Sequence, residues 1–235
     1  QENFSFLNSY LERVSPVIRK NNGFIDKYIG DAVMALFPNN IHNAVDAAIE
    51  IKRTIGVFNT TRIRSGYQPV QIGIGIHTGK IMLGTIGEKE RLETTVVSDA
   101  VNIASRIEEL TKPFQTPILI SEQVIQNLDN PMNYNFRFLG KVLVKGKKKS
   151  VSVFEVYTGN EDDSVHKKRL TQEHFEQGLI RFLKQDFINS RVAFAKVLAY
   201  FPEDKPSKIY YNEAGYLQKH GVPPQWSGVL QFNNQ

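Results

Sequence analysis

The chain of 235 residues is long enough for one large domain, or for one domain and a small appendage, at about 150 residues per domain. Its hydrophobic share of 41% and charged share of 23% are typical of globular proteins, which excludes collagen-like, low-complexity and wholly disordered chains. The absence of cysteine excludes disulfides, zinc ribbons, iron–sulfur clusters and thiol chemistry. The net charge of +5 is modest, and the basic runs at 145–149 and 166–169 are typical of solvated loops.

No apolar run approaches the roughly 18 residues of a membrane span, and no signal peptide opens the chain. We therefore expect this segment to be soluble and cytoplasmic. The first predicted element, an amphipathic helix over residues 1–20, begins without a capping residue. We expect the chain to be cut from a larger protein, and a membrane anchor upstream of residue 1 is left open.

After this helix, two β-type runs joined at Gly30 and Asp31 predict a hairpin, and a second amphipathic helix follows. Strands and helices then alternate as far as residue 157. The elements predicted after the first helix are strands at 24–29 and 32–37, a helix around 44–55, strands at 70–77, 81–86 and 94–97, a helix as far as residue 110 capped by Ser98, a strand at 117–120, a short helix after Ser121, and a hairpin of 136–144 with 151–157.

Residues 1–158 are thus predicted to form a two-layer α+β domain, with helices on one face of a largely antiparallel sheet. The polar residues 159–169 are expected to be a linker. Residues 170–235 predict three helices that resemble one tetratricopeptide-like unit plus a third helix. Since one such unit does not bury its apolar face alone, we expect this tail to pack on the first domain or to contact an upstream domain or another protein. Trp226 is expected to anchor the end of the chain onto its own domain.

The glycine-rich run from residue 73 to 80 is similar to a phosphate-binding P-loop, but its spacing is wrong. Five residues separate Gly73 from Gly79, and Ile81 stands where Ser or Thr is required. The glycines are instead expected to permit close backbone approach within a sheet. His77 has no partner at metal-ligand spacing, so we interpret it as structural.

Several polar residues have two readings from the sequence alone. Asp31 suits a tight turn, whereas Lys27 falls on a strand face where alternation places an apolar residue, so it either snorkels or reaches into a polar pocket. Asn102 and Arg106 lie four apart on one helix face, as solvated polar residues or as a functional pair. Lys145 offers a charge suited to a polyphosphate, although a solubilising loop has the same composition.

Four motifs stand in a characteristic order along the chain. They are Phe24–Phe37 (FIDKYIGDAVMALF), Ile74–Gly79 (IGIHTG), Thr95–Arg106 (TVVSDAVNIASR) and Val144–Lys147 (VKGK). They resemble, in order, the metal-binding hairpin, the central strand, the catalytic helix segment and the final hairpin of the class III adenylyl/guanylyl cyclase family. The resemblance covers residues 3–158, and the tail resembles an extension of some bacterial members.

This resemblance implies a ferredoxin-like βαββαβ core that works as a head-to-tail homodimer, with active sites at the interface. It implies an adenylate cyclase, in which the ribose 3′-oxygen of ATP attacks the α-phosphorus to give 3′,5′-cyclic AMP and pyrophosphate. Two Mg²⁺ or Mn²⁺ ions per site would assist the attack. Asp31 resembles one of the two aspartates that bind them.

The other implied site residues also follow position by position. Lys27 and Thr95 resemble the pair that selects adenine. Asn102 resembles the residue that orients the ribose, and Arg106 the one that stabilises charge on the phosphate in the transition state. Lys145 resembles the lysine that holds the terminal phosphates.

Two positions depart from the family's pattern. Its other metal-binding aspartate lies on a first strand ahead of the first helix, and this chain begins after that point. Residues 1–235 alone are therefore expected not to cyclise ATP appreciably. Ser98 stands where the family usually has glycine, and we expect it to be tolerated as a helix cap.

Two alternatives to an enzyme of cyclic-nucleotide signalling stay open. The first is a non-catalytic, cyclase-like module that binds nucleotide or regulates another chain. The second is a ferredoxin-like nucleic-acid binder, which the basic balance favours. RNA-recognition sheets place two or three aromatic residues on one face, and the run 70–77 has none, so we expect no nucleic-acid partner.

Overall fold

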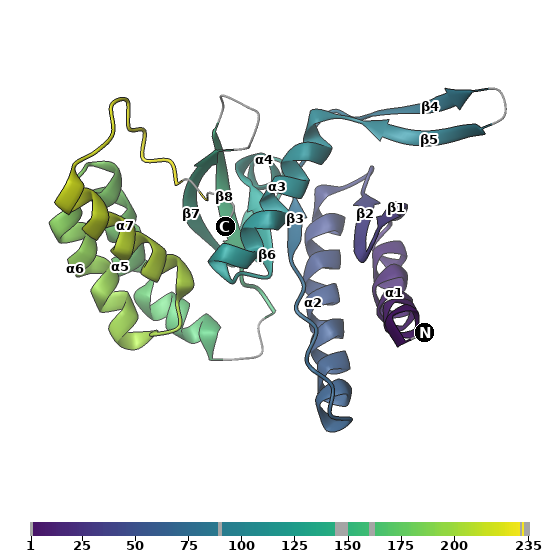
Figure 1. Cartoon of the computed structure of the whole chain (residues 1–235), viewed down its shortest axis with the longest axis horizontal. Coiled ribbons are helices and arrows are strands. Elements are labelled where there is room, and N and C mark those ends of the chain that lie inside the picture. Colours follow the sequence, from purple (N-terminus) through teal and green to yellow (C-terminus); the bar gives the residue numbers. More distant parts are fainter. Residues whose placement is uncertain (1, 89–90, 144–149, 160–162, 231, 233–235) are drawn as a thin grey trace.

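The computed structural model describes residues 2–88, 91–143, 150–159, 163–230 and 232. Its helices are α1 (Glu2–Lys20), α2 (Ile41–Arg64), α3 (Asp99–Phe114), α4 (Glu122–Gln126), α5 (Ser164–Leu183), α6 (Phe187–Tyr200) and α7 (Lys205–His220), with a 3₁₀ turn at Pro131–Asn133. Its strands are β1 (Phe24–Ile29), β2 (Ala32–Leu36), β3 (Ile74–Ile76), β4 (Met82–Glu88), β5 (Arg91–Val97), β6 (Ile118–Ser121), β7 (Phe136–Leu143) and β8 (Ser150–Val156). The chain is mixed α+β, as predicted (Figure 1).

The described strands are arranged in three sheets. One has four strands in the order β3-β6-β8-β7, parallel between β3 and β6 and antiparallel elsewhere. The pairs β1–β2 and β4–β5 are separate antiparallel hairpins, and β4–β5 extends away from the body of the molecule (Figure 1). No ladder between described residues joins β2 to β3, so one ferredoxin-like sheet that contains both stays a prediction.

The hairpin β1–β2 and the four-stranded sheet nevertheless share a hydrophobic core under α1 and α2. This core combines Val14, Val17 and Ile18 of α1, Ile51, Ile55 and Phe58 of α2, Ile25, Val33, Ala35 and Phe37 of the hairpin region, and Val70, Ile72 and Ile74 in and before β3. Packing of α1 and α2 therefore holds the two sheets next to each other without hydrogen bonds between their strands.

The strand predicted at 70–77 is shorter in the structure, where β3 covers Ile74–Ile76. Asn59 of α2 takes the place of a neighbouring strand at Val70. Its Nδ2 donates to the Val70 carbonyl at 2.9 Å, and its Oδ1 accepts from the Val70 amide at 2.7 Å. Since one side chain satisfies both backbone groups, the chain needs no ladder there.

The predicted strands at 81–86 and 94–97 are longer in the structure. Within the segment predicted as a polar link, residues 87, 88 and 91–93 continue their ladder, with Gly87 opposite Leu92. The helix predicted around 44–55 is likewise longer, as α2. The hairpins predicted at 24–37 and 136–157 and the helix capped by Ser98 are confirmed.

The glycines of the predicted strand permit close backbone approach, as expected, but the approaching element is a helix. A Cβ added at Gly75 would overlap the backbone nitrogen of Glu108 and the carbonyl oxygen of Ala104, both on α3. A Cβ at Gly73 would overlap the Thr111 hydroxyl. The absence of a side chain at both positions lets α3 lie directly on this part of the sheet.

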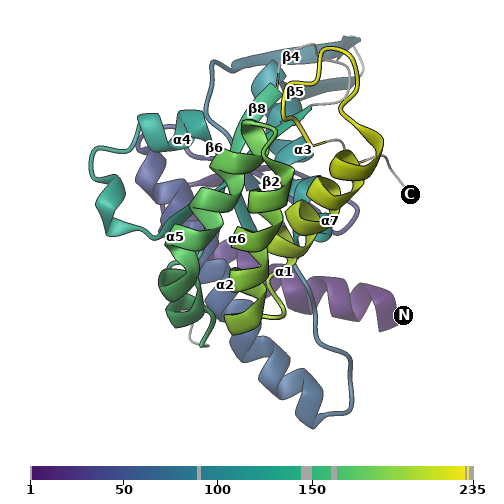
Figure 2. The same cartoon turned by 90° about the vertical axis from the view of Figure 1, so that its left-hand side faces the viewer.

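The helices α5, α6 and α7 pack beside β7, at the edge of the four-stranded sheet (Figure 1). Figure 2 shows these three helices next to one another. One core runs from the sheet and α3 into these helices. It includes Ile107, Phe114, Leu119, Leu139, Val142 and Val153, together with Phe175, Leu179, Phe182, Phe194, Val197, Tyr210, Ala214 and Leu217. The tail thus shares its core with the rest of the chain.

Three helices follow residue 163, as predicted, but α5 begins at Ser164, within the range 159–169 that was expected to be a linker. The resemblance of these helices to a tetratricopeptide unit stays a prediction, as do the domain boundaries. Trp226 packs edge-on against Phe182 and Phe187, with ring centroids 5.5 and 5.7 Å away, so it anchors its segment within the chain as expected. Among the described residues, no helix has the length and apolar character that a membrane crossing requires.

Four buried charged side chains connect the sheet with the helical tail. Arg137 of β7 donates to Glu155 of β8 through Nε at 2.9 Å and Nη2 at 2.6 Å, and Nη2 lies 2.8 Å from Asp204 before α7. Lys168 of α5 pairs with the other oxygen of Glu155. Burial alone would raise the pKa of Glu155, but the two cations lower it below its ordinary value. Two cations and two anions therefore compensate one another inside the protein.

Candidate active site

The turn between β1 and β2 carries the predicted metal-binding residue. Gly30 has φ of 63°, as the first central position of a tight hairpin turn requires, and Asp31 follows it at the exposed tip. Burial is the main cause that raises the pKa of Tyr10 on α1 and of Glu108 on α3. The negative charge of Asp31 raises both pKa values further. The tip of the hairpin is therefore within electrostatic range of both helices.

Lys27 projects from β1 next to a bulge. The register of β1 on β2 shifts between Ile25 and Lys27, which leaves Asp26 as the extra residue. The Asp26 carboxylate is 6% exposed, and its Oδ2 makes no hydrogen bond but lies 3.2 Å from the Lys27 ammonium. Asp26 was not predicted as part of the site, although a carboxylate beside a lysine in a largely apolar strand is visible in the sequence.

The helix α3 presents Asn102 and Arg106 one turn apart, as predicted. Its first turn is capped by Ser98, whose Oγ accepts from the Ala100 amide at 3.0 Å and donates to the Lys80 carbonyl at 2.6 Å. The Ser98 backbone is extended, with φ of −164° and ψ of 143°, a conformation open to any residue. Serine in place of glycine therefore strains nothing here, and it ties the start of α3 to the base of β4.

Arg106 is held by its own helix. Its Nη1 donates to both oxygens of Glu109 at 2.7 and 2.9 Å, and about a third of its side chain is exposed. Asn102 is exposed one turn earlier. Because the opposite face of α3 is fixed against Gly73 and Gly75, this face keeps a constant direction relative to the sheet.

Glu108 was not predicted as part of the site. It sits on the β3 side of α3, and burial is the main cause of its raised pKa, with smaller effects of neighbouring charges that include Asp31. His77 at the end of β3 points to Ser121, with 2.7 Å between Nδ1 and the hydroxyl oxygen, and burial lowers its pKa. This hydrogen bond to a buried serine agrees with the structural role expected of His77.

The described side chains provide part of the ligand set that is expected for the metal ions. Mg²⁺ takes one or two carboxylates from the protein and further oxygens from phosphates and water. In the described part of the chain, no three acidic or histidine side chains converge. Asp31 fits the role of a single exposed carboxylate ligand, whereas the Asp26 carboxylate is engaged by Lys27.

Two predicted residues have side chains outside the described part of the chain. Thr95 lies in β5 opposite Gly84, but its side chain is not described, and Lys145 falls in the segment 144–149, which is not described at all. Their roles stay predictions. The structure thus places Asn102 and Arg106 on one helix face and Lys27 and Asp31 on one hairpin, and the roles of all six residues stay predictions.

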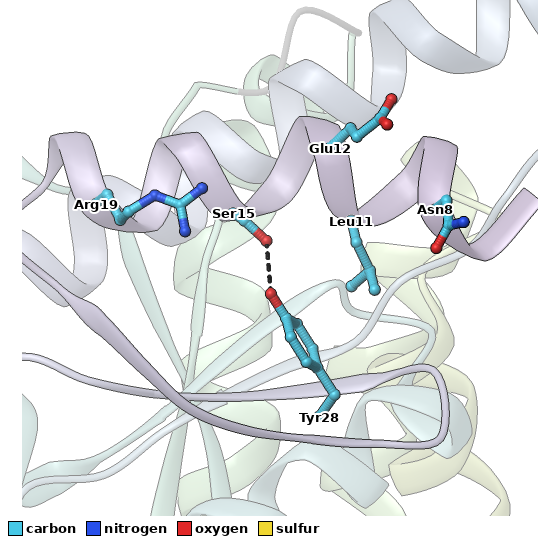
Figure 3. Close-up of a pocket in the computed structure, with 6 residues that line it drawn as sticks. All are labelled: Asn8, Leu11, Glu12, Ser15, Arg19 and Tyr28. Atoms are coloured by element: carbon cyan, nitrogen blue, oxygen red, sulfur yellow. Dashed lines mark hydrogen bonds between the residues drawn. The ribbon is translucent and has the colours of Figure 1, made fainter.

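A shallow hollow of about 240 Å³ lies between α1 and β1. It is lined by Asn8, Leu11, Glu12, Ser15, Arg19 and Tyr28 (Figure 3). The hydroxyls of Ser15 and Tyr28 lie 3.2 Å apart across it. None of the predicted site residues lines this hollow, so it is not the nucleotide site that the sequence predicts.

Known proteins are similar in sequence to most of this chain. An adenylate cyclase of Anabaena cylindrica is 45% identical over 161 residues, which are 66% of this chain and 32% of that protein. A terminal-differentiation-specific adenylate cyclase of Dictyostelium discoideum is 36% identical over 211 residues, or 87% of this chain and 10% of that protein. The chain therefore spans a third or less of the length of these two relatives.

Solved structures share the fold. The adenylyl cyclase CyaB of P. aeruginosa matches with a TM-score of 0.57 and 27% identity, over 68% of this chain and 84% of that chain. The guanylyl cyclase Cya2 matches with a TM-score of 0.58 and 30% identity, over 68% of this chain and 82% of that chain. The family described as the adenylate and guanylate cyclase catalytic domain matches residues 1–157. With that match over two thirds of its length, the chain belongs to the adenylate and guanylate cyclase catalytic domain family.

Proposed function

We propose that this chain forms most of the catalytic domain of an adenylyl cyclase, which converts ATP to 3′,5′-cyclic AMP and pyrophosphate. The observation that carries the proposal is the face of α3, where Asn102 and Arg106 lie one turn apart while Gly73 and Gly75 fix the opposite face. The names of the Anabaena and Dictyostelium relatives favour ATP over GTP as substrate. The likeness to a guanylyl cyclase structure makes base selection a matter for direct test.

In the proposed reaction the ribose 3′-hydroxyl gives up its proton to water and its oxygen attacks the α-phosphorus, the bond from that phosphorus to the bridging oxygen breaks, and pyrophosphate leaves. The amide of Asn102 orients the ribose, and the guanidinium of Arg106 exchanges Glu109 for the phosphate on which charge develops. Lys27 reads the base together with Thr95, and Lys145 binds the terminal phosphates. Mg²⁺ or Mn²⁺ at Asp31, when bound, supplies charge that acidifies the 3′-hydroxyl and holds the polyphosphate.

We also propose a head-to-tail homodimer with active sites at its interface. The β4–β5 hairpin supports this, since it projects from the body of the molecule (Figure 1) and exposes Met82 and Leu83 at 72% and 58%. Burial of exposed apolar side chains on a projecting arm against another chain is favourable, because it removes their surface from water.

The alternative is a non-catalytic module that binds nucleotide or regulates another chain. One observation favours it: three metal-ligating side chains do not converge anywhere among the described residues. In the proposed enzyme, a second metal-binding carboxylate comes from a strand ahead of residue 1, so the 235 residues alone do not cyclise ATP appreciably. In the alternative, no upstream segment confers activity.

The deciding experiment measures cyclic AMP formed from ATP and Mn²⁺ by a protein extended upstream of residue 1. We expect activity that Asp31→Ala abolishes and that Arg106→Ala lowers by about 10²- to 10³-fold, the usual effect of removing one donor to transition-state charge. Lys27→Glu should shift the ratio of ATP to GTP turnover. An inactive protein that folds and dimerises would instead establish the non-catalytic alternative.

A further inference from the structure

The outer edge of β7 is bound by the helical tail at three successive points. At the start of the strand, Arg137 pairs with Asp204, which also caps α7 through the Ser207 amide at 3.1 Å. Further along the strand, α7 donates a hydrogen bond to the Leu139 carbonyl, and the amide of residue 230 donates one to the Lys141 carbonyl. β7 is the last strand of the four-stranded sheet, so the tail covers an edge that no described strand pairs with.

The middle contact is made at a bulge. The ladder between β7 and β8 shifts register between Phe138 and Gly140, and Leu139 is the extra residue. The backbone groups of a bulged residue fall outside the ladder, so they need another partner when they are buried. The Tyr210 hydroxyl of α7 donates to the Leu139 carbonyl at 2.6 Å, and both residues are at most 1% exposed.

Gly140 shapes the strand to receive this tyrosine. Its φ of 111° is left-handed, and a Cβ at this position would overlap the Tyr210 hydroxyl. The bulge, the glycine and the tyrosine therefore form one complementary contact between the sheet and the tail. Because a bulge sets the direction in which a strand continues, this contact also sets the course of the outer half of β7.

The third contact lies in that outer half. The Leu230 amide donates to the Lys141 carbonyl at 3.1 Å, and Leu230 forms a parallel bridge with Val142. Along the chain, Lys145 follows Val142 by three residues. The tail thus holds the strand directly ahead of the residue proposed to bind the terminal phosphates.

We infer that the helical tail is a positioning element for substrate binding, with Tyr210 and Leu230 as positioning residues. They act on ATP through β7, the strand that precedes Lys145 in the chain, and neither touches the substrate. The inference rests on the proposed function in naming ATP as the ligand. Its structural half, that these two residues hold the β7–β8 hairpin in place, stands independently.

The test compares Tyr210→Phe with Tyr211→Phe in the full-length protein. Both changes remove one phenolic hydroxyl from α7, but the Tyr211 hydroxyl accepts from Arg191 at 3.0 Å within the tail, whereas that of Tyr210 reaches the sheet. Hydrogen exchange of amides in 141–143 and 150–152 and the KM and kcat for ATP are measured. We expect Tyr210→Phe to speed exchange there about tenfold and to raise KM about fivefold with kcat within about twofold.

Tyr211→Phe should leave both readouts unchanged. Leu230→Pro, which removes the amide donor, should act in the same direction as Tyr210→Phe. Equal exchange in the two tyrosine variants would overturn the inference, and so would a loss of kcat at unchanged KM. Hydrogen exchange can be measured without turnover. If the unaltered full-length protein has no cyclase activity, the proposed function is contradicted, and the exchange rates still decide whether Tyr210 and Leu230 hold the β7–β8 hairpin in place.

Discussion

At Gly75 the requirement for glycine is steric and comes from α3. The residue that follows in sequence, Ile76, is buried in the sheet, and the helix backbone around Ala104 and Glu108 occupies the space of a side chain at position 75. Periodicity in a sequence gives the face on which a residue lies, but it does not give the depth at which the next layer packs. The glycine was therefore predicted to allow close approach, and the approaching element was found only in the structure.

We predict that Gly75→Ala lowers the free energy of unfolding by about 2 kcal/mol or more, because the added methyl group meets rigid backbone. Gly56→Ala is the matched control, since Gly56 lies within α2 with open space around its Cβ position. There alanine should stabilise by up to about 1 kcal/mol through its helix propensity. Denaturant unfolding of both variants measures the difference, and equal destabilisation would contradict the packing of α3 on Gly75.

At the scale of elements, buried charges link β7 and β8 to α5 and to the start of α7. Arg137, Glu155, Lys168 and Asp204 are each at most 8% exposed. A buried charge is costly without a partner, so each of these elements depends on the others for compensation. The sequence shows these four residues as ordinary polar positions, since the partners are far apart along the chain.

We predict that Lys168→Met destabilises the protein by about 3 kcal/mol, because it leaves one oxygen of the buried Glu155 without its cation. Lys167→Met is the control. Lys167 is partly exposed, and its pair with Asp163 at 3.3 Å is an i,i+4 surface pair worth less than about 1 kcal/mol. The midpoint of thermal unfolding should be clearly lower for Lys168→Met than for Lys167→Met. Similar midpoints would refute the importance of the buried pair.

The same network predicts acid sensitivity. The pKa of Glu155 is lowered in the folded state, so its contribution to stability is complete above its ordinary pKa of 4.5 and is lost as the pH falls further. Glu155→Gln removes the titrating group and should be less stable than the unaltered protein at pH 7. The gap between their melting temperatures should narrow below about pH 4.5, and a gap that is constant between pH 7 and pH 3.5 would count against this role.

For the whole molecule, the tail and the family domain share one hydrophobic core. Phe114, Leu139 and Val142 pack with residues of α5, α6 and α7, and Trp226 covers the end of that core. Removal of a segment that contributes this much of a core exposes the rest of that core to water. The match to the family ends at residue 157, yet the packing continues beyond it.

We predict that a chain ending at residue 158 unfolds at a lower temperature than residues 1–235, with weaker cooperativity. Removal of the tail would expose apolar surface beside β7 and would leave Arg137 without Asp204. Calorimetry of the two chains at the same pH and salt concentration is the measurement. Equal melting temperatures with equal cooperativity would show that the family domain is stable without the tail.

Much of the fold and of the candidate site follows from local signals. The hairpin tip at Gly30 and Asp31, the cap at Ser98 and the spacing of Asn102 and Arg106 each depend on a few adjacent residues, and the structure contains all of them. Asp26, Glu108 and the shortened β3 were not foreseen. They depend on a bulge, on a neighbouring charge and on a side chain of α2, which contact them across long stretches of sequence.

The sequence by itself determined the order of helices and strands, because capping, turn chemistry and hydrophobic period act within a few residues, and the resemblance of its four motifs indicated the family. The tertiary structure alone decided how α3 lies on Gly73 and Gly75, how Tyr210 completes the bulge at Leu139, and how Glu155 gains its two cations. Each of these contacts joins residues that are distant along the chain, and its energy depends on burial. Burial is a property of the packed molecule, so no local pattern encodes it.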